Sequence, residues 1–225
     1  MRTVVEVRAG RGSPMRKGRG RLDRPTIVAA AIAVARTEGL SAVTMRRIAD
    51  ELGCGPMSLY RHVADRDALV LEMLDVVAAG IEVPPPVTEP RAELVAVLTA
   101  VHAALAVEHW AVLPLVIERL ASPRILPLVE RVFVALARAG VAGRDVVAVN
   151  QLLWQFVYGE LLWTHHDRPA TFARQMVHNA SSEQYPALAA AVRDLPDVVT
   201  DHFDQNLRRL LDGVLPGSVT ASRDA

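Results

Sequence analysis

The stretch that decides the fold runs from Thr44 to Val63 and reads Thr44-Met45-Arg46-Arg47-Ile48-Ala49-Asp50-Glu51-Leu52-Gly53-Cys54-Gly55-Pro56-Met57-Ser58-Leu59-Tyr60-Arg61-His62-Val63. Its first half predicts a short helix, because Thr44 is a favourable N-cap residue and apolar side chains recur at helical spacing over 45–52. Gly53 and Gly55 then break the helix, and Pro56 suits the first turn of another helix that ends near Ala64. Two short helices around a glycine turn form a helix-turn-helix.

The flanking residues extend this unit into a longer helical pattern. Upstream, Pro25 suits the start of an apolar helix that stops at Glu38-Gly39-Leu40. Downstream, Asp65 is placed to cap a fourth helix over 66–79, and Val83-Pro84-Pro85-Pro86 marks a loop. No segment has a convincing strand pattern, so an all-α protein is predicted. We expect further helices over residues 91–108, 113–121, 123–139, 144–166, 171–179, 185–192 and 197–212.

Charge is strongly segregated along the chain, although the formal net charge is +0. Residues 1–24 carry eight Arg or Lys residues against two acidic ones, a net charge of +6. This segment lacks the apolar periodicity that would offset the entropy of ordering it, so a flexible basic arm is predicted. Residues 1–66 reach +7, and the remainder must carry −7. A basic head on an acidic body indicates that one end approaches a polyanion.

Composition argues against several classes of protein. The longest apolar stretches, 94–105 and 152–162, are interrupted by polar residues before the roughly 20 residues of a bilayer span. The basic N-terminus is not followed by the apolar region of a secretory signal, so a cytoplasmic protein is expected. Its single cysteine, Cys54, agrees with a reducing compartment, and a redox role for that residue is disfavoured.

The sequence shows no catalytic or metal-binding motif. A nucleophile elbow, a phosphate loop and a metal-ligand spacing are all missing, so neither an enzyme nor a cofactor is expected. His165-His166-Asp167 is interpreted as a helix end rather than a metal site, because adjacent residues on a helix project in different directions.

The helix-turn-helix resembles the signature of the TetR family of transcriptional regulators. The resemblance rests on residues 44–53 and 58–63, on the Gly39-Leu40 stop before them, and on Asp65-Arg66-Asp67-Ala68-Leu69 after them. It extends into the second half of the chain, covering roughly 25–213 in all. There Ala137-Arg138-Ala139-Gly140, the helix with Gly159-Glu160, Tyr185-Pro186-Ala187-Leu188 and residues 203–213 are similar to the ligand-binding half of tetracycline-repressor-like members.

The resemblance implies three parts in one all-α chain. Residues 1–24 form the basic arm and 25–68 a three-helix, helix-turn-helix DNA-binding domain. A connecting helix joins this domain to a helical bundle over 69–225 that binds a ligand and dimerises. The long helix from Arg144 and the last helix, through Phe203, Leu207, Leu210 and Leu211, would form a four-helix interface with their symmetry mates. The alternative is that both helices are ordinary core.

The expected DNA contacts lie on the two short helices. A short helix that projects from a compact unit fits the major groove and presents its first turn to base edges. Arg46 is the first candidate for a base or phosphate contact. The resemblance places Tyr60 and His62 at phosphates, Ser58 at a base edge or phosphate, and Arg61 and Arg66 at further phosphates. The DNA-binding candidates are Arg46, Arg47, Pro56, Met57, Ser58, Tyr60, Arg61, His62 and Arg66.

Other interpretations of these residues stay open. Pro56 and Met57 offer no bidentate hydrogen bonds, so apolar contact with thymine methyl groups is one expected part of the readout. Tyr60 is alternatively a core residue, and Arg46 and Arg47 a solvated face. Leu59, Ile48 and Leu52 are assigned to packing. The arm either enters a minor groove or is a solvated tail.

The resemblance also implies an effector pocket in the C-terminal bundle, for which aromatic side chains and a few polar groups are available. Gln151, Gln155 and Tyr158 share one helical face, a pattern that packing explains equally well. A small, largely hydrophobic effector is expected. The effector-binding candidates are His102, Trp110, Gln151, Trp154, Gln155 and Tyr158.

The expected function is repression that a small molecule relieves. The effector would favour a conformation in which two recognition helices are wrongly spaced for successive major grooves, with the helix over 66–79 as the connecting rod. Activation instead of repression stays open. A small helical enzyme, a sequence-nonspecific DNA-organising protein, and an adaptor that has lost DNA binding are the alternatives.

Overall fold

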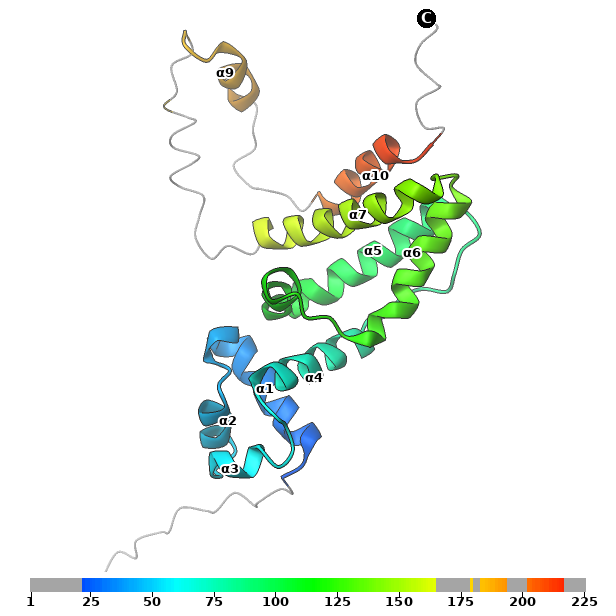
Figure 1. Cartoon of the computed structure of the whole chain (residues 1–225). Helices are drawn as coiled ribbons and strands as arrows, with labels where there is room; N and C mark the ends of the chain where they lie inside the picture. The colour runs from blue at the N-terminus through cyan, green and yellow to red at the C-terminus, as the bar shows by residue number, and fades with distance from the viewer. Residues whose placement is uncertain (1–21, 165–178, 180–182, 194–201, 217–225) are drawn as a thin grey trace, which may run out of the picture.

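The computed structural model of the chain describes residues 22–164, 179, 183–193 and 202–216 (Figure 1). Within these ranges every regular element is a helix or a helical turn, as the sequence patterns predict. The first four α-helices form a head, and the later ones form a bundle beside it (Figure 1). The helices are α1 (Arg24–Glu38), α2 (Met45–Glu51), α3 (Pro56–Leu59), α4 (Arg66–Ala79), α5 (Pro90–Val107), α6 (Leu126–Arg138), α7 (Gly143–Thr164), α9 (Pro186–Arg193) and α10 (Phe203–Val214).

Side-chain caps set the beginnings of the head helices. The carboxylate of Asp23 accepts a hydrogen bond from the amide of Thr26 at 3.0 Å and begins α1. Thr44 caps α2 and Asp65 caps α4, with cap distances of 3.1 and 2.8 Å, which confirms both predicted caps. Such caps satisfy amides that have no partner within their own helix. At the other end of α1, Gly39 has a φ of 84°, a conformation that glycine adopts at little cost.

The bundle is built around α5. In Figure 1, α7 and α10 lie side by side above α5, and α6 crosses beside them. Leucines from four helices are fully buried between these elements: Leu98, Leu136, Leu153, Leu161 and Leu207. Each such side chain stabilises the fold by about 1.5–3 kcal/mol. Helix α5 is long and apolar enough to cross a membrane, yet one face of it, with Leu94, Leu98 and Leu105, is buried in the core, and α5 packs against α6, α7 and α10.

The structure differs from the predicted pattern in two segments. The third helix is a single turn, Pro56–Leu59, rather than a helix to Ala64, because the chain turns at Tyr60 to His62. The predicted helix over 113–121 is replaced by η2 (His109–Ala111) and the π-helical turn η3 (Pro114–Glu118). Arg119 ends this turn in the left-handed region, with a φ of 56°, which stops further α-helix. A 3₁₀ turn, η4 (Pro123–Ile125), precedes α6.

Three predictions fall wholly or mainly outside the described residues. These are the basic arm apart from its last residues, His165-His166-Asp167, and the helix over 171–179. Arg24, assigned to the arm, is instead the first residue of α1.

Candidate DNA interface and ligand cavity

Buried contacts hold the helix-turn-helix in place. The turn between α2 and α3 passes through Gly53, whose φ of 61° is left-handed, and the amide of Cys54 donates to the carbonyl of Ala49 at 2.9 Å. Ile48 and Leu59 are fully buried beneath the turn, and Leu52 packs partly buried against the same core, so the prediction that they serve packing is confirmed. The single turn of α3 is therefore fixed from its inner side, and its outer side is open to solvent.

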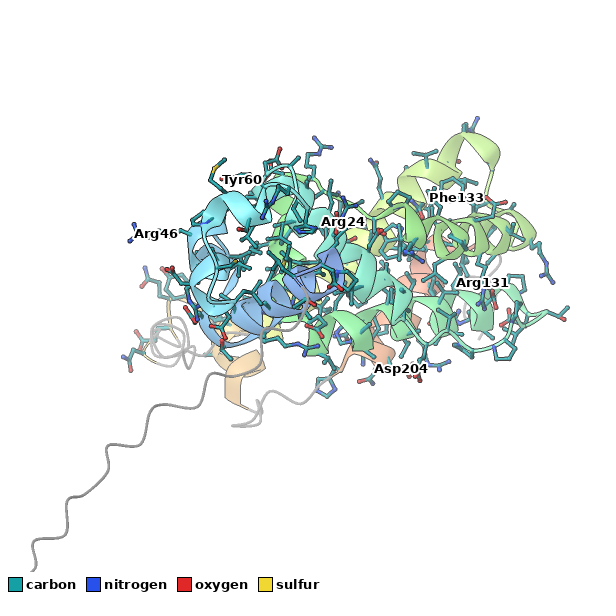
Figure 2. The ribbon with its side chains drawn as sticks, turned by 90° about the horizontal axis from the view of Figure 1, so that it is seen from below. Arg24, Arg46, Tyr60, Arg131, Phe133 and Asp204 are labelled. Carbon is teal, nitrogen blue, oxygen red and sulfur yellow. The ribbon has the colours of Figure 1, made fainter. Side chains whose placement is uncertain are left out.

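The outer side of the two helices presents a mixed polar and apolar surface. Met57 is 77% exposed and Tyr60 47% exposed, so the interpretation of Tyr60 as a core residue is wrong. Arg46, Pro56 and Arg61 are exposed as well. Figure 2 shows Arg46 and Tyr60 on the same edge of the head, directed outward. The structure thus brings cations, a phenol and apolar groups together on one exposed surface, and these are the kinds of side chain that contact phosphates and base edges in a major groove.

Ser58 and His62 are half-buried at the two ends of this surface. The carbonyl of His62 accepts two hydrogen bonds from the guanidinium of Arg24, at 2.8 and 3.1 Å. Arg24 also forms an ion pair of 3.3 Å with Glu72 on α4. Arg24 therefore ties the end of the recognition segment to α1 and α4. Sequence reasoning missed this role because a contact across 38 residues leaves no local pattern.

Two of the candidate arginines are engaged within the protein. Arg47 pairs with Glu38 at 2.6 Å and with Glu51 at 2.8 Å, and the arginine holds the pKa of the Glu38 carboxyl below its usual range. Arg66 donates to the carbonyl of Val43 at 3.3 Å and pairs with Glu118 at 3.4 Å. Among the described residues, Arg46 and Arg61 have no ion pair. The positive charge most available to DNA thus lies on these two side chains.

A cavity of about 200 Å³ lies between the head and the bundle helices. Helix α4 forms one wall, and α5, η3, η4, α6 and α7 contribute the rest. Its lining is almost entirely aliphatic and aromatic, which is typical of a site for a small organic ligand. The lining residues are Leu74, Val77, Ala78, Ile81, Val101, Leu105, Leu115, Ala121, Ser122, Ile125, Val129, Trp154 and Tyr158.

Trp154 and Tyr158 are the two effector candidates that line this cavity. Their rings stack with centroids 6.1 Å apart, and the indole nitrogen of Trp154 donates to the side chain of Asn150 at 3.1 Å. Burial raises the pKa of the Tyr158 hydroxyl to about 12, so this group stays protonated at neutral pH. No hydrogen-bond partner for it occurs among the described residues.

The other four effector candidates lie elsewhere. Gln151 and Gln155 are exposed and do not line the cavity, although they share a helical face with Tyr158. The ring of His102 stacks on Phe203 of α10, with centroids 3.8 Å apart. Trp110 is buried and donates its indole N–H to Glu108 at 2.8 Å. Sequence reasoning also missed most of the lining, because aliphatic residues such as Val77 look like any other core residue.

Ion pairs and hydrogen bonds join the head to the bundle next to the cavity. Arg36 of α1 pairs with the carboxylate of Glu108, and this arginine lowers the pKa of the carboxyl. Ser122, a lining residue, donates to the carboxylate of Asp75 on α4, which also pairs with Arg124 at 3.6 Å. These contacts link the wall of the cavity to the head.

One face of α7 is left uncovered by the other described elements. It combines small, apolar and amide side chains at helical spacing, and we call it the α7 face: Ala148, Gln151, Leu152, Gln155, Gly159 and Trp163. Phe203, Leu207 and Leu211 of α10, predicted for a dimer interface, are buried within the protomer, which matches the alternative core role. Leu210 is partly buried.

Comparison with known proteins identifies the family. Residues 27–73 match the family of bacterial regulatory proteins named tetR, and residues 91–216 match the tetracyclin repressor-like C-terminal domain. The chain is 30% identical over 199 residues to an HTH-type transcriptional regulator of Saccharopolyspora erythraea, covering 86% of this chain and 84% of that one. It is likewise 30% identical to the HTH-type transcriptional repressor DrrR1 of Streptomyces coeruleorubidus, covering 86% and 76% of the two chains.

Solved structures agree in fold. The TetR family protein ActR of Streptomyces coelicolor, solved in complex with actinorhodin, superimposes with a TM-score of 0.75 at 26% identity, covering 89% of this chain and all of that one. Helix-turn-helix, connecting helix and bundle follow one another in the order that the sequence predicts. This chain is a member of the TetR family of transcriptional regulators, with a tetracycline-repressor-like C-terminal domain.

Proposed function

We propose that this regulator is a homodimeric repressor that leaves its operator when a small molecule fills the cavity beside α4. One feature carries this proposal: α4 begins directly after the helix-turn-helix and also forms a wall of the cavity through Leu74, Val77 and Ala78. A ligand that needs more room must displace this wall. The displacement then changes the position of α2 and α3 relative to the bundle.

The mechanism is a shift between two conformations. A ligand that binds the DNA-incompetent conformation more tightly draws the protein away from DNA, and DNA weakens ligand binding by the same factor. Couplings of this kind typically reach about 1–3 kcal/mol, or roughly 5- to 150-fold in affinity. The complex of ActR with actinorhodin supports a small organic ligand for the present chain, and the name of DrrR1 supports repression.

The DNA contacts follow from the exposed edge of the head. Arg46 and Arg61 supply the free positive charge, Tyr60 a phosphate contact, and Pro56 and Met57 apolar contacts to thymine methyl groups. His62 and Ser58 flank them as phosphate contacts. Arg47 and Arg66 must break their ion pairs with carboxylates before they can contact a phosphate, so they contribute less to DNA binding. The chain acts by binding in the cytoplasm rather than by catalysis.

Gel-shift binding to the DNA that flanks the coding region tests this proposal. We expect a dimer complex that resists unrelated competitor DNA. Arg46→Ala should weaken it by about 10-fold, the effect of one good charged contact, and Tyr60→Phe by less. Arg144→Ala, which removes an exposed arginine from the bundle, is the matched control and should leave the affinity unchanged.

Each contrary result indicates a different class of protein. Equal competition by all DNA indicates a sequence-nonspecific binder. No complex under any condition indicates an adaptor that has lost DNA binding. Equal weakening by Arg46→Ala and Arg144→Ala would show that net charge, rather than the edge of the head, binds DNA.

A further inference from the structure

The cavity contains few polar groups, and most of them already have partners. The hydroxyl of Ser122 donates to Asp75 and accepts from the amide of Arg124, and the indole N–H of Trp154 is held by Asn150. The Tyr158 hydroxyl remains, unpartnered among the described residues and lining the cavity. A ligand in this cavity therefore meets one available hydrogen-bonding group.

Among the described residues, none with a charged side chain lines the cavity. Burying an ionised carboxylate without a partner is strongly unfavourable, so a ligand anion would find no compensation for its lost hydration. Behind the lining, the carboxylate of Asp75 accepts from Ser122 and is paired with Arg124 at 3.6 Å, so this pair supplies no net positive charge that could compensate an anion. The same carboxylate is already neutralised by Arg124, so it offers little to a cation.

The volume limits the size of the ligand. A cavity of about 150 Å³ with a similar apolar lining accommodates benzene. The cavity beside α4, at about 200 Å³, has room for a second fused ring. The rings of Trp154 and Tyr158, with centroids 6.1 Å apart and planes tilted by 27°, supply the aromatic part of the lining, and aliphatic side chains of α4 and α5 supply much of the rest.

We propose that the cavity binds an uncharged aromatic molecule of about two fused rings, whose hydroxyl or carbonyl oxygen is hydrogen-bonded by the Tyr158 hydroxyl. The proposal rests on the proposed function only in naming this molecule as the effector. It goes further because it excludes ligands with a carboxylate group. It also assigns recognition of the ligand's hydroxyl or carbonyl oxygen to one residue, Tyr158. Tyr158 is then the residue that distinguishes an oxygenated aromatic ligand from a plain hydrocarbon.

Isothermal titration calorimetry at neutral pH, with four naphthalene probes and the full chain, tests this assignment. The probes are naphthalene, 2-naphthol, 2-naphthamide and 2-naphthoate. The last two have nearly the same shape and differ in charge. We expect 2-naphthoate to bind at least about 10-fold more weakly than 2-naphthamide, because its charge is unpaired in the cavity.

Two variants separate the hydrogen bond from the packing. Tyr158→Phe should weaken the binding of 2-naphthol by about 5- to 10-fold, which is the effect of one hydrogen bond. It should change the affinity for naphthalene less than about twofold. Tyr185→Phe, which alters an exposed tyrosine next to α9, is the matched control and should change neither. Equal binding of 2-naphthoate and 2-naphthamide overturns the proposal. So does an equal effect of Tyr158→Phe on the binding of 2-naphthol and of naphthalene, or the failure of all four probes to bind.

Failure here is distinct from failure of the proposed function. Calorimetry requires no DNA, so missing probe binding together with an intact operator complex overturns only the ligand class. A missing operator complex overturns the repressor and leaves the calorimetric result standing.

Discussion

At the scale of single residues, the ion pair of Glu93 and Arg131 makes the stability of the bundle depend on pH. The carboxylate of Glu93 is 5% exposed, accepts from the guanidinium of Arg131 at 2.5 Å, and also accepts from the amide of Val87 at 2.9 Å. The hydrogen bond from Arg131 lowers the pKa of Glu93 below its usual range. The carboxylate thereby ties α5 to α6 and to the loop before α5.

We expect Glu93→Gln to lower the free energy of unfolding at pH 7 by about 2 kcal/mol, because Arg131 loses its buried partner. The folded pKa lies below the unfolded one, so this stabilisation is complete above about pH 4.5 and is lost as the pH falls through the folded value. Urea unfolding of both proteins from pH 7 to pH 3 measures it. Asp204→Asn, which breaks the exposed pair with Arg208, is the control and should change stability little. A constant difference at every pH would contradict the role of the carboxylate.

At the scale of elements, α4 is both the wall of the cavity and the continuation of the head. Ala78 lines the cavity, whereas Ala79, the next residue, is exposed. Ala78→Leu should therefore fill part of the cavity, raise the melting temperature by a few degrees, and weaken 2-naphthol binding at least about 10-fold. Ala79→Leu makes the same substitution at an exposed position of the same helix, so it should change neither the melting temperature nor the binding of 2-naphthol. Thermal unfolding and calorimetry measure both effects, and equal results for the two variants would place the ligand elsewhere.

The elements also show how far sequence reasoning reaches. Thr44, Asp65 and the glycine after α1 are local signals, and they predicted the head helices to within a residue or two at most ends. The prediction of a helix around Pro114 was wrong. The left-handed conformation of Arg119 and the π-helical turn depend on packing, which the periodicity of the sequence does not show. The exposed candidates on α2 and α3 were available from the motif. The cavity could not be predicted from the sequence, since its aliphatic lining comes from six elements that meet only in the folded chain.

At the scale of the whole molecule, we predict that two copies of the proposed dimer meet through the α7 face. Small residues such as Ala148 and Gly159 allow close approach of a symmetry-related helix, and Leu152 lies between them, 39% exposed. Gln151 and Gln155, which do not reach the cavity, lie on this face.

Leu152→Arg should convert the dimer into a monomer, because the two-fold axis brings each new charge close to its symmetry mate. Size-exclusion chromatography with light scattering measures the mass, and the gel shift should lose the dimer complex. Val134→Arg places the same charge at an equally exposed apolar position on α6 and serves as the control. A wild-type monomer, or a Leu152→Arg dimer, would exclude this face as the interface.

The single turn of α3 has a further consequence for how such regulators diversify. Its inner side is fixed by Leu59 alone, and Pro56, Met57 and Tyr60 contribute little to the core. Substitutions at exposed positions of this kind typically change stability by less than about 0.5 kcal/mol. The protein can therefore acquire a new operator preference through a few codons without losing its fold, and its two inputs, DNA sequence and ligand, can evolve independently.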